Sequence, residues 1–140
     1  MMNKPTSHRR NPRRGASAVE FALVAPVFFL VVLGIMEFGR MVMTQQVITN
    51  ASREGARIAV LDSATTDKVK KRIDGYLAAA NVRGATVIVS PNPPTSAKFG
   101  EQVSVRIRVP YSAISTLSKT FMNSGKELVA EAIMRRETAE

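Results

Sequence analysis

The chain has no cysteine and a single histidine, His8, and these two scarcities exclude several classes of site. Without cysteine there is neither a disulfide framework nor a thiolate nucleophile. The histidine lies in the basic N-terminal head, which argues against Ser-His-Asp catalysis and against a zinc site. The sequence also lacks a glycine-rich phosphate loop, a cluster of metal ligands and a nucleophile paired with a base. We therefore predict that the protein is not an enzyme and uses no cofactor or metal.

Acidic residues are missing from the first fourteen positions, which hold five of the twenty Lys and Arg residues. The net charge of +9 taken alone suggests a nucleic acid or an anionic lipid as partner. Outside this N-terminal cluster, however, 15 basic residues face 11 acidic ones, an excess of only +4. We therefore interpret the cluster as a signal for membrane topology and predict no nucleic-acid partner. The five residues are Lys4, Arg9, Arg10, Arg13 and Arg14.

Charge is nearly absent from residues 16–36, where Glu20 is the one ionisable side chain. A helix rises about 1.5 Å per residue, so this stretch is long enough for a hydrocarbon core of roughly 30 Å. The positive-inside rule puts the basic head in the cytoplasm and the residues after about 37 on the exported side. A cleavable secretory signal fits less well, because residues 37–41 offer no small-x-small cleavage site. We predict one transmembrane helix.

Glu20 needs an explanation, because an ionisable group at the bilayer centre costs roughly 2.5–3.5 kcal/mol on insertion scales. One interpretation is an interfacial carboxylate in the first turns of a helix, where the macrodipole favours negative charge. In the other, the order of basic head, Gly15 and Glu20 resembles the processing site of type IV prepilins, which a peptidase cuts after the glycine. A cut there gives Ala16 an α-ammonium group four residues before Glu20, on the same helical face. The alternative to prepilin-like processing is that the segment remains as an uncleaved N-terminal anchor.

Helical periodicity continues beyond the apolar stretch to about Leu61, and it carries two charged motifs. The first motif contains Glu37, Gly39 and Arg40, and the second contains Arg53, Glu54, Gly55 and Arg57. Glu37 with Arg40, and Glu54 with Arg57 or Arg53, are predicted to form surface ion pairs. Two interpretations of the second motif stay open. It is either a solvated helix face with a glycine where another segment packs close, or a contact between subunits.

Three segments together resemble the TadE-like family over about residues 9–61: Val19-Glu20-Phe21-Ala22-Leu23 before Pro26, Met36-Glu37-Phe38-Gly39-Arg40, and Ala51-Ser52-Arg53-Glu54-Gly55-Ala56-Arg57. The resemblance implies a minor pilin, or pseudopilin, of a tight-adherence (Flp-type) type IV pilus system in the bacterial inner membrane. Gly15, Ala16 and Glu20 would then be the processing site, and Glu20 would also pair with charge in the assembly. The role of the seven residues of the two charged motifs stays open.

The resemblance also implies partners. These are a prepilin peptidase, other pseudopilins and the major pilin, the inner-membrane pilus assembly platform and the lipid bilayer. The runner-up function is an uncleaved, membrane-tethered binding module of the envelope, which would recognise its ligand through a basic helix or a strand region. No nucleic acid is expected in either case.

The segment after the stem predicts a small α+β domain. Thr66 or Asp67 is expected to cap a helix that carries Val69, Ile73 and Leu77 on one face. Strands are expected at residues 86–90 and 101–109, joined by a hairpin connection, and at 127–134, although that last segment is also compatible with a helix. A short helix or turn is expected at 112–122.

The predicted fold class is α+β and pilin-like, with a long N-terminal helix followed by one helix and a short antiparallel sheet. The predicted organisation is a basic cytoplasmic leader at 1–15 that is cleaved, a transmembrane helix at 16–36, a helical stem at 37–61 and an exported domain at 62–140. A domain of that size barely supports its own core, so the stem helix is expected to supply an apolar partner.

Overall fold

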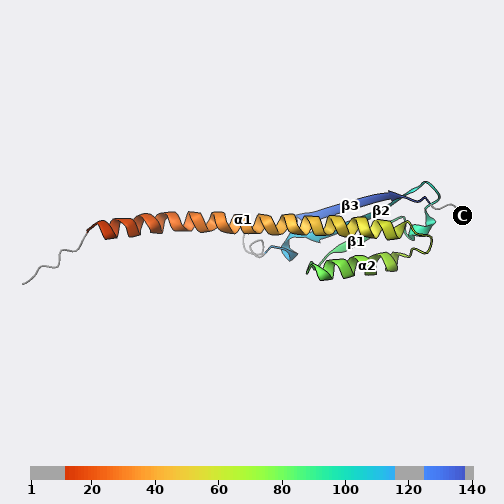
Figure 1. Cartoon of the computed structure of the whole chain (residues 1–140), viewed down its shortest axis with the longest axis horizontal. Helices are drawn as coiled ribbons and strands as arrows, with labels where there is room; N and C mark the ends of the chain where they lie inside the picture. Colours follow the sequence, from red (N-terminus) through yellow and green to blue (C-terminus); the bar gives the residue numbers. More distant parts are fainter. Residues whose placement is uncertain (1–11, 116–124, 138–140) are drawn as a thin grey trace, which may run out of the picture. The chain divides into compact units, whose positions relative to one another are not determined.

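The computed structural model describes residues 12–115 and 125–137, and it has the predicted α+β architecture (Figure 1). Residues 1–11 of the predicted leader and residues 116–122 of the predicted short helix or turn lie outside the described residues. The chain divides into two compact units, residues 1–36 and 37–140. The elements in chain order are α1 (Pro12–Ala59), α2 (Thr66–Ala79), β1 (Thr86–Ser90), η1 (Pro94–Ser96), β2 (Gln102–Pro110), η2 (Tyr111–Ala113) and β3 (Glu127–Arg135).

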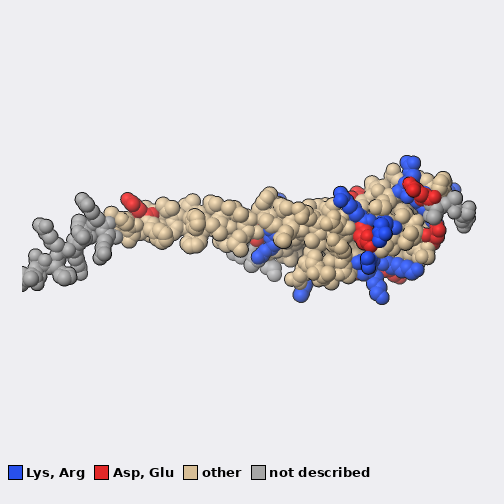
Figure 2. All heavy atoms as spheres, viewed as in Figure 1, with Lys and Arg blue, Asp and Glu red and all other residues tan. Residues whose placement is uncertain are grey.

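The part of α1 in the first unit exposes its large apolar side chains. Phe21 and Leu23 are each 72% exposed, and no part of the most apolar 18-residue window, of mean hydropathy 2.5, is buried. Figure 2 shows how little charge this stretch carries. By length and composition, the helix from Gly15 to Ala59 could cross a membrane. Contiguous exposed apolar surface of this kind marks a contact with lipid or protein.

The three strands of the second unit form an antiparallel sheet in the order β1-β2-β3. The strand predicted at 86–90 has the observed bounds, and β2 begins and ends one residue later than predicted. The 127–134 segment is a strand, so its helical alternative is wrong. The register explains this, because Ala130 and Ala132 lie opposite Ile107 and Val105 and are buried with them.

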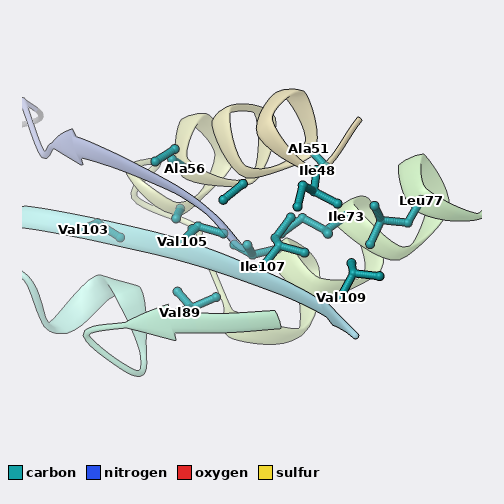
Figure 3. Packing of buried hydrophobic residues seen from close by; sticks show 14 of the residues in the cluster. Ile48, Ala51, Ala56, Ile73, Leu77, Val89, Val103, Val105, Ile107 and Val109 are labelled. Carbon is teal, nitrogen blue, oxygen red and sulfur yellow. The ribbon is translucent and has the colours of Figure 1, made fainter. Parts of the chain in front are cut away.

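The core unites α1, α2 and one face of the sheet (Figure 3). Alternate residues of β2 from Val103 to Val109 are fully buried, as the alternation in the sequence predicts. The expectation that the stem helix completes the core is confirmed, because α1 contributes four buried apolar residues. The buried cluster consists of Ile48, Ala51, Ala56 and Ala59 of α1, Val69, Ile73 and Leu77 of α2, and Val89, Ala97, Val103, Val105, Ile107, Val109, Ala130 and Ala132.

The N-terminal cap of α2 differs from the prediction, which placed it at Thr66 or Asp67. Thr65 is the cap, because its backbone is extended (φ −123°, ψ 151°) and its hydroxyl accepts a hydrogen bond from the Lys68 amide at 3.2 Å. Thr66 is already the first helical residue. Thr65, Thr66 and Asp67 are all residue types that cap helices, so the sequence alone defines the start of α2 only to within a position or two.

Arg136, just after β3, joins three segments that are distant in the sequence. Its Nη1 donates to the carbonyl oxygens of Thr95 at 2.8 Å and Ala97 at 2.9 Å, and its Nη2 lies 3.1 Å from Asp62. Its side chain is only 14% exposed. The guanidinium fork thus ties the end of the sheet to the β1–β2 connection and to the turn between the two helices.

We expect Arg136→Lys to destabilise the second unit by about 1–3 kcal/mol, because a lysine cannot reproduce the fork that reaches two carbonyl groups and a carboxylate. Pulse proteolysis of the full chain in detergent micelles, at increasing urea concentrations, gives the unfolding midpoint that measures this destabilisation. Arg135→Lys is the matched control, since Arg135 is exposed, and it is expected to change the midpoint little. Equal effects of both substitutions would contradict the assignment.

Candidate functional site

The three residues of the predicted processing site lie near the start of α1 and are all exposed. Gly15 has no atom of another residue's side chain within 4 Å of where a Cβ would stand, and Ala16 and Glu20 are also exposed. The bond after Gly15 falls in the first turns of α1, which begins at Pro12. This bond joins the fourth and fifth residues of α1, one turn from the helix N-terminus, where helix ends fray. The site is therefore accessible in the first unit.

In the first charged motif, the predicted ion pair between Glu37 and Arg40 stays a prediction. Oε1 of Glu37 is buried without a hydrogen-bond partner among the described residues, and Arg40 is exposed. The Arg40 carbonyl accepts a hydrogen bond from the Thr44 hydroxyl at 3.0 Å. Nothing lies within 4 Å of a Cβ placed on Gly39. This motif stands about 24 Å before the second one along α1, so the two do not share a site.

The second charged motif lies where α1 crosses α2 and β2. A Cβ on Gly55 would stand 2.6 Å from Ile73 Cδ1 and 3.2 Å from Val105 Cγ1. Only a residue without a side chain allows this approach, and Ala56 beside it is fully buried. Gly55 is therefore a glycine where another segment packs close, and the two interpretations of the motif as a whole stay open.

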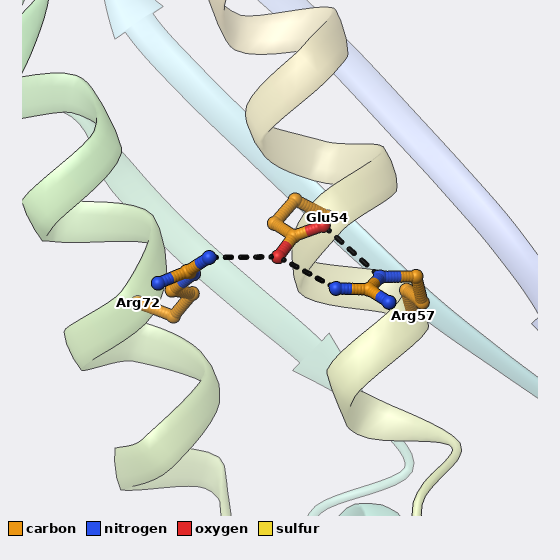
Figure 4. A network of polar contacts seen from close by, with 3 residues as sticks. All are labelled: Glu54, Arg57 and Arg72. Carbon is orange, nitrogen blue, oxygen red and sulfur yellow. Dashed lines mark hydrogen bonds and ion pairs between the residues drawn. The ribbon is translucent and has the colours of Figure 1, made fainter.

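The charged residues of the same motif form an ion-pair network on the outside of the crossing (Figure 4). Arg57 donates from Nε to Glu54 Oε2 at 3.1 Å and from Nη2 to Oε1 at 3.2 Å. Arg72 of α2 donates from Nη2 to Oε1 at 3.2 Å. The hydrogen bonds from Arg57, with the one from Arg72, outweigh the opposing effect of burial and hold the pKa of Glu54 below its ordinary value. The pair of Glu54 with Arg57 was predicted, whereas the link to α2 was not.

We expect Glu54→Gln to destabilise the second unit by no more than about 1 kcal/mol at neutral pH, because exposed ion pairs contribute little. Since the pKa of Glu54 is lowered by folding, its contribution is present above the unfolded value near 4.5 and is lost as the pH falls through the folded pKa. Urea midpoints measured from pH 7 down to pH 3 should therefore converge for the wild type and the variant. A difference between the two urea midpoints that stays constant down to pH 3 would contradict this.

The structure brings Glu54, Gly55 and Arg57 together at one crossing, with Arg53 exposed beside them. Sequence reasoning missed Arg72 and Arg136, since their partners are 18 and 74 residues away. The only signal for Arg72 was its place in the basic run of α2. Among the described residues, no group of three or more His, Cys, Asp or Glu side chains could hold a metal ion.

These features define a class of protein: a small α+β domain whose first helix also carries an apolar stretch that could cross a membrane. The match to a known family is more specific. The family model described as TadE-like protein matches residues 15–57, which include all three motif segments from Val19 onward. No curated protein and no solved structure matches the chain. The TadE-like resemblance is thus confirmed for these residues, and it indicates a Tad pilus-associated protein.

Proposed function

We propose that the protein is a minor pilin, or pseudopilin, that acts in the assembly of a tight-adherence (Flp-type) pilus. It inserts in the bacterial inner membrane with its N-terminus in the cytoplasm, and a prepilin peptidase cuts it after Gly15. The mature helix then meets the other pseudopilins, the major pilin and the assembly platform. The protein serves assembly by shape and helix contacts rather than by chemistry.

One observation carries this proposal: Gly15, Ala16 and Glu20 stand exposed at the start of an apolar helix, in the segment that the TadE-like model matches. Glu20 is the only charge in residues 16–36. After cleavage, the new α-ammonium on Ala16 compensates the carboxylate, either within one helix or from a neighbouring subunit. An uncleaved anchor offers Glu20 no such partner.

The test is a complementation experiment in the native host. Deletion of the gene is expected to reduce surface pili, and the wild-type chain should restore them. Glu20→Ala should be cut normally yet fail to restore pili, because the unpaired α-ammonium disfavours helix assembly. Glu127→Ala, at an exposed position at the start of β3, is the matched control and should restore pili. Normal piliation after deletion would contradict the proposal and favour the membrane-tethered binding module.

A further inference from the structure

Two adjoining hollows follow the groove between α1 and α2. The larger, of about 670 Å³, is lined by Ile58, Lys68, Lys71, Arg72, Gly75 and Tyr76. The smaller, of about 420 Å³, shares Arg72 and Tyr76 with it and extends the groove along α1 past Arg53, Glu54 and Arg57. The outward-facing charges of the second motif therefore line the same groove as the basic run of α2.

Positive charge dominates the rim of this groove. Among the described residues that line the groove, five are cations and one, Glu54, is an acid, and that carboxylate is already bound by Arg57 and Arg72. Figure 2 shows Lys and Arg side chains gathered over this part of the domain. The cations are Arg53, Arg57, Lys68, Lys71 and Arg72. A surface of one sign attracts ligands of the opposite sign and speeds their encounter.

The floor of the groove is apolar. Ile58 is half-buried, and the large ring of Tyr76 is 41% exposed. Gly75, which has no side chain, lies beside Tyr76 in the lining of the groove. Exposed tyrosine beside arginine is a composition enriched at the centres of protein interfaces. The groove thus combines an apolar anchor point with a cationic rim.

We propose that this groove binds an acidic segment of a partner protein. Carboxylates of the segment face Arg53, Lys68 and Lys71, and an apolar side chain lies against Ile58 and Tyr76. Glu54 accepts hydrogen bonds from Nε and Nη2 of Arg57 and from Nη2 of Arg72, so these two arginines add positive charge beside the segment while the other three cations meet its carboxylates. A lipid headgroup would use the charge but not the floor, so a protein segment fits the groove better. This binding goes beyond pilus assembly, and it does not depend on cleavage after Gly15.

The first experiment measures binding of a labelled synthetic helical peptide, with glutamates at i and i+4 and leucines between them, to the full chain in detergent micelles. Fluorescence anisotropy is expected to report binding that weakens as salt is added. The double variant Arg53→Gln with Lys71→Gln should weaken binding about tenfold, at roughly threefold for each cation. Neither residue belongs to the Glu54 network, so the fold is retained.

The matched control is the double variant Arg83→Gln with Lys70→Gln, which removes the same residue types outside the groove. It should bind the peptide as the wild type does. Tyr76→Ala should weaken binding and Tyr76→Phe should preserve it, since the ring supplies apolar area. Equal losses of peptide affinity in the two double variants would overturn the proposal in favour of a diffuse charge effect. Unchanged affinity in Tyr76→Ala would overturn it as well.

The second experiment identifies the occupant in native membranes, with a photo-crosslinking residue in place of Tyr76. Mass spectrometry of the crosslinked peptide should find a protein segment rich in Asp and Glu. The crosslink yield should fall several-fold with Arg53→Gln and Lys71→Gln together and stay unchanged with Arg83→Gln and Lys70→Gln together. An adduct with lipid alone, or with a protein segment lacking acidic residues, would overturn the proposal. Loss of piliation plays no part in this readout, so it is independent of the proposed function.

Discussion

Gly15→Leu is expected to leave the whole population of the protein uncut in its native host. A peptidase must approach the backbone closely at the cut bond, and the small residues Gly15 to Ala18 permit that approach. The position is exposed and nothing within 4 Å would oppose a side chain, so leucine alters recognition and not the fold. Intact mass of the protein from membranes should show only the precursor, and pili should not be restored.

Gly34→Leu is the control for this substitution, because Gly34 lies in the same apolar helix with open space around it. It should be cut as the wild type is, since the change lies far from the bond after Gly15. If Gly15→Leu were cut as completely as Gly34→Leu, the assignment of the cut to the bond after Gly15 would be wrong.

Gly55→Leu is expected to destabilise the second unit by about 1–3 kcal/mol or more. Its side chain has to enter space held by Ile73 Cδ1 and Val105 Cγ1, at 2.6 and 3.2 Å from the Cβ position. Both neighbours are fully or almost fully buried and have little room to move. Pulse proteolysis of the full chain in micelles, at increasing urea concentrations, measures the loss of stability.

Gly75→Leu is the matched control, because Gly75 lies within α2 with nothing within 4 Å of its Cβ position. There the better helix propensity of leucine should stabilise the protein by up to about 1 kcal/mol. A double-mutant cycle of Gly55→Ala with Ile73→Val refines the test, since valine lacks the Cδ1 atom. A coupling of about 0.5 kcal/mol or more is expected. Additive effects would contradict a direct contact.

Local patterns in the sequence predicted most of the second unit's secondary structure. The alternation from Val103 to Val109 defined β2, and the spacing of Val69, Ile73 and Leu77 defined the buried face of α2. Both patterns follow from which side of an element faces the core. The 127–134 segment stayed ambiguous because its small alanines fit a helix as well as a strand, and only pairing with β2 decides between them.

The candidate site was predicted in part. The bond after Gly15 can be proposed from residue order alone, because it depends on neighbours in the sequence. The role of Gly55 needed the crossing with α2 and β2, since a glycine in a helix does not reveal what approaches it. The groove needed the link between Glu54 and Arg72, 18 residues apart, which no local spacing predicts.

The central claim is that this chain is processed as a prepilin. The most direct test is the intact mass and N-terminal sequence of the protein recovered from its native membrane. The account predicts a mature chain that begins at Ala16, with residues 1–15 absent. A protein that retains Arg13, Arg14 and Gly15 would contradict it.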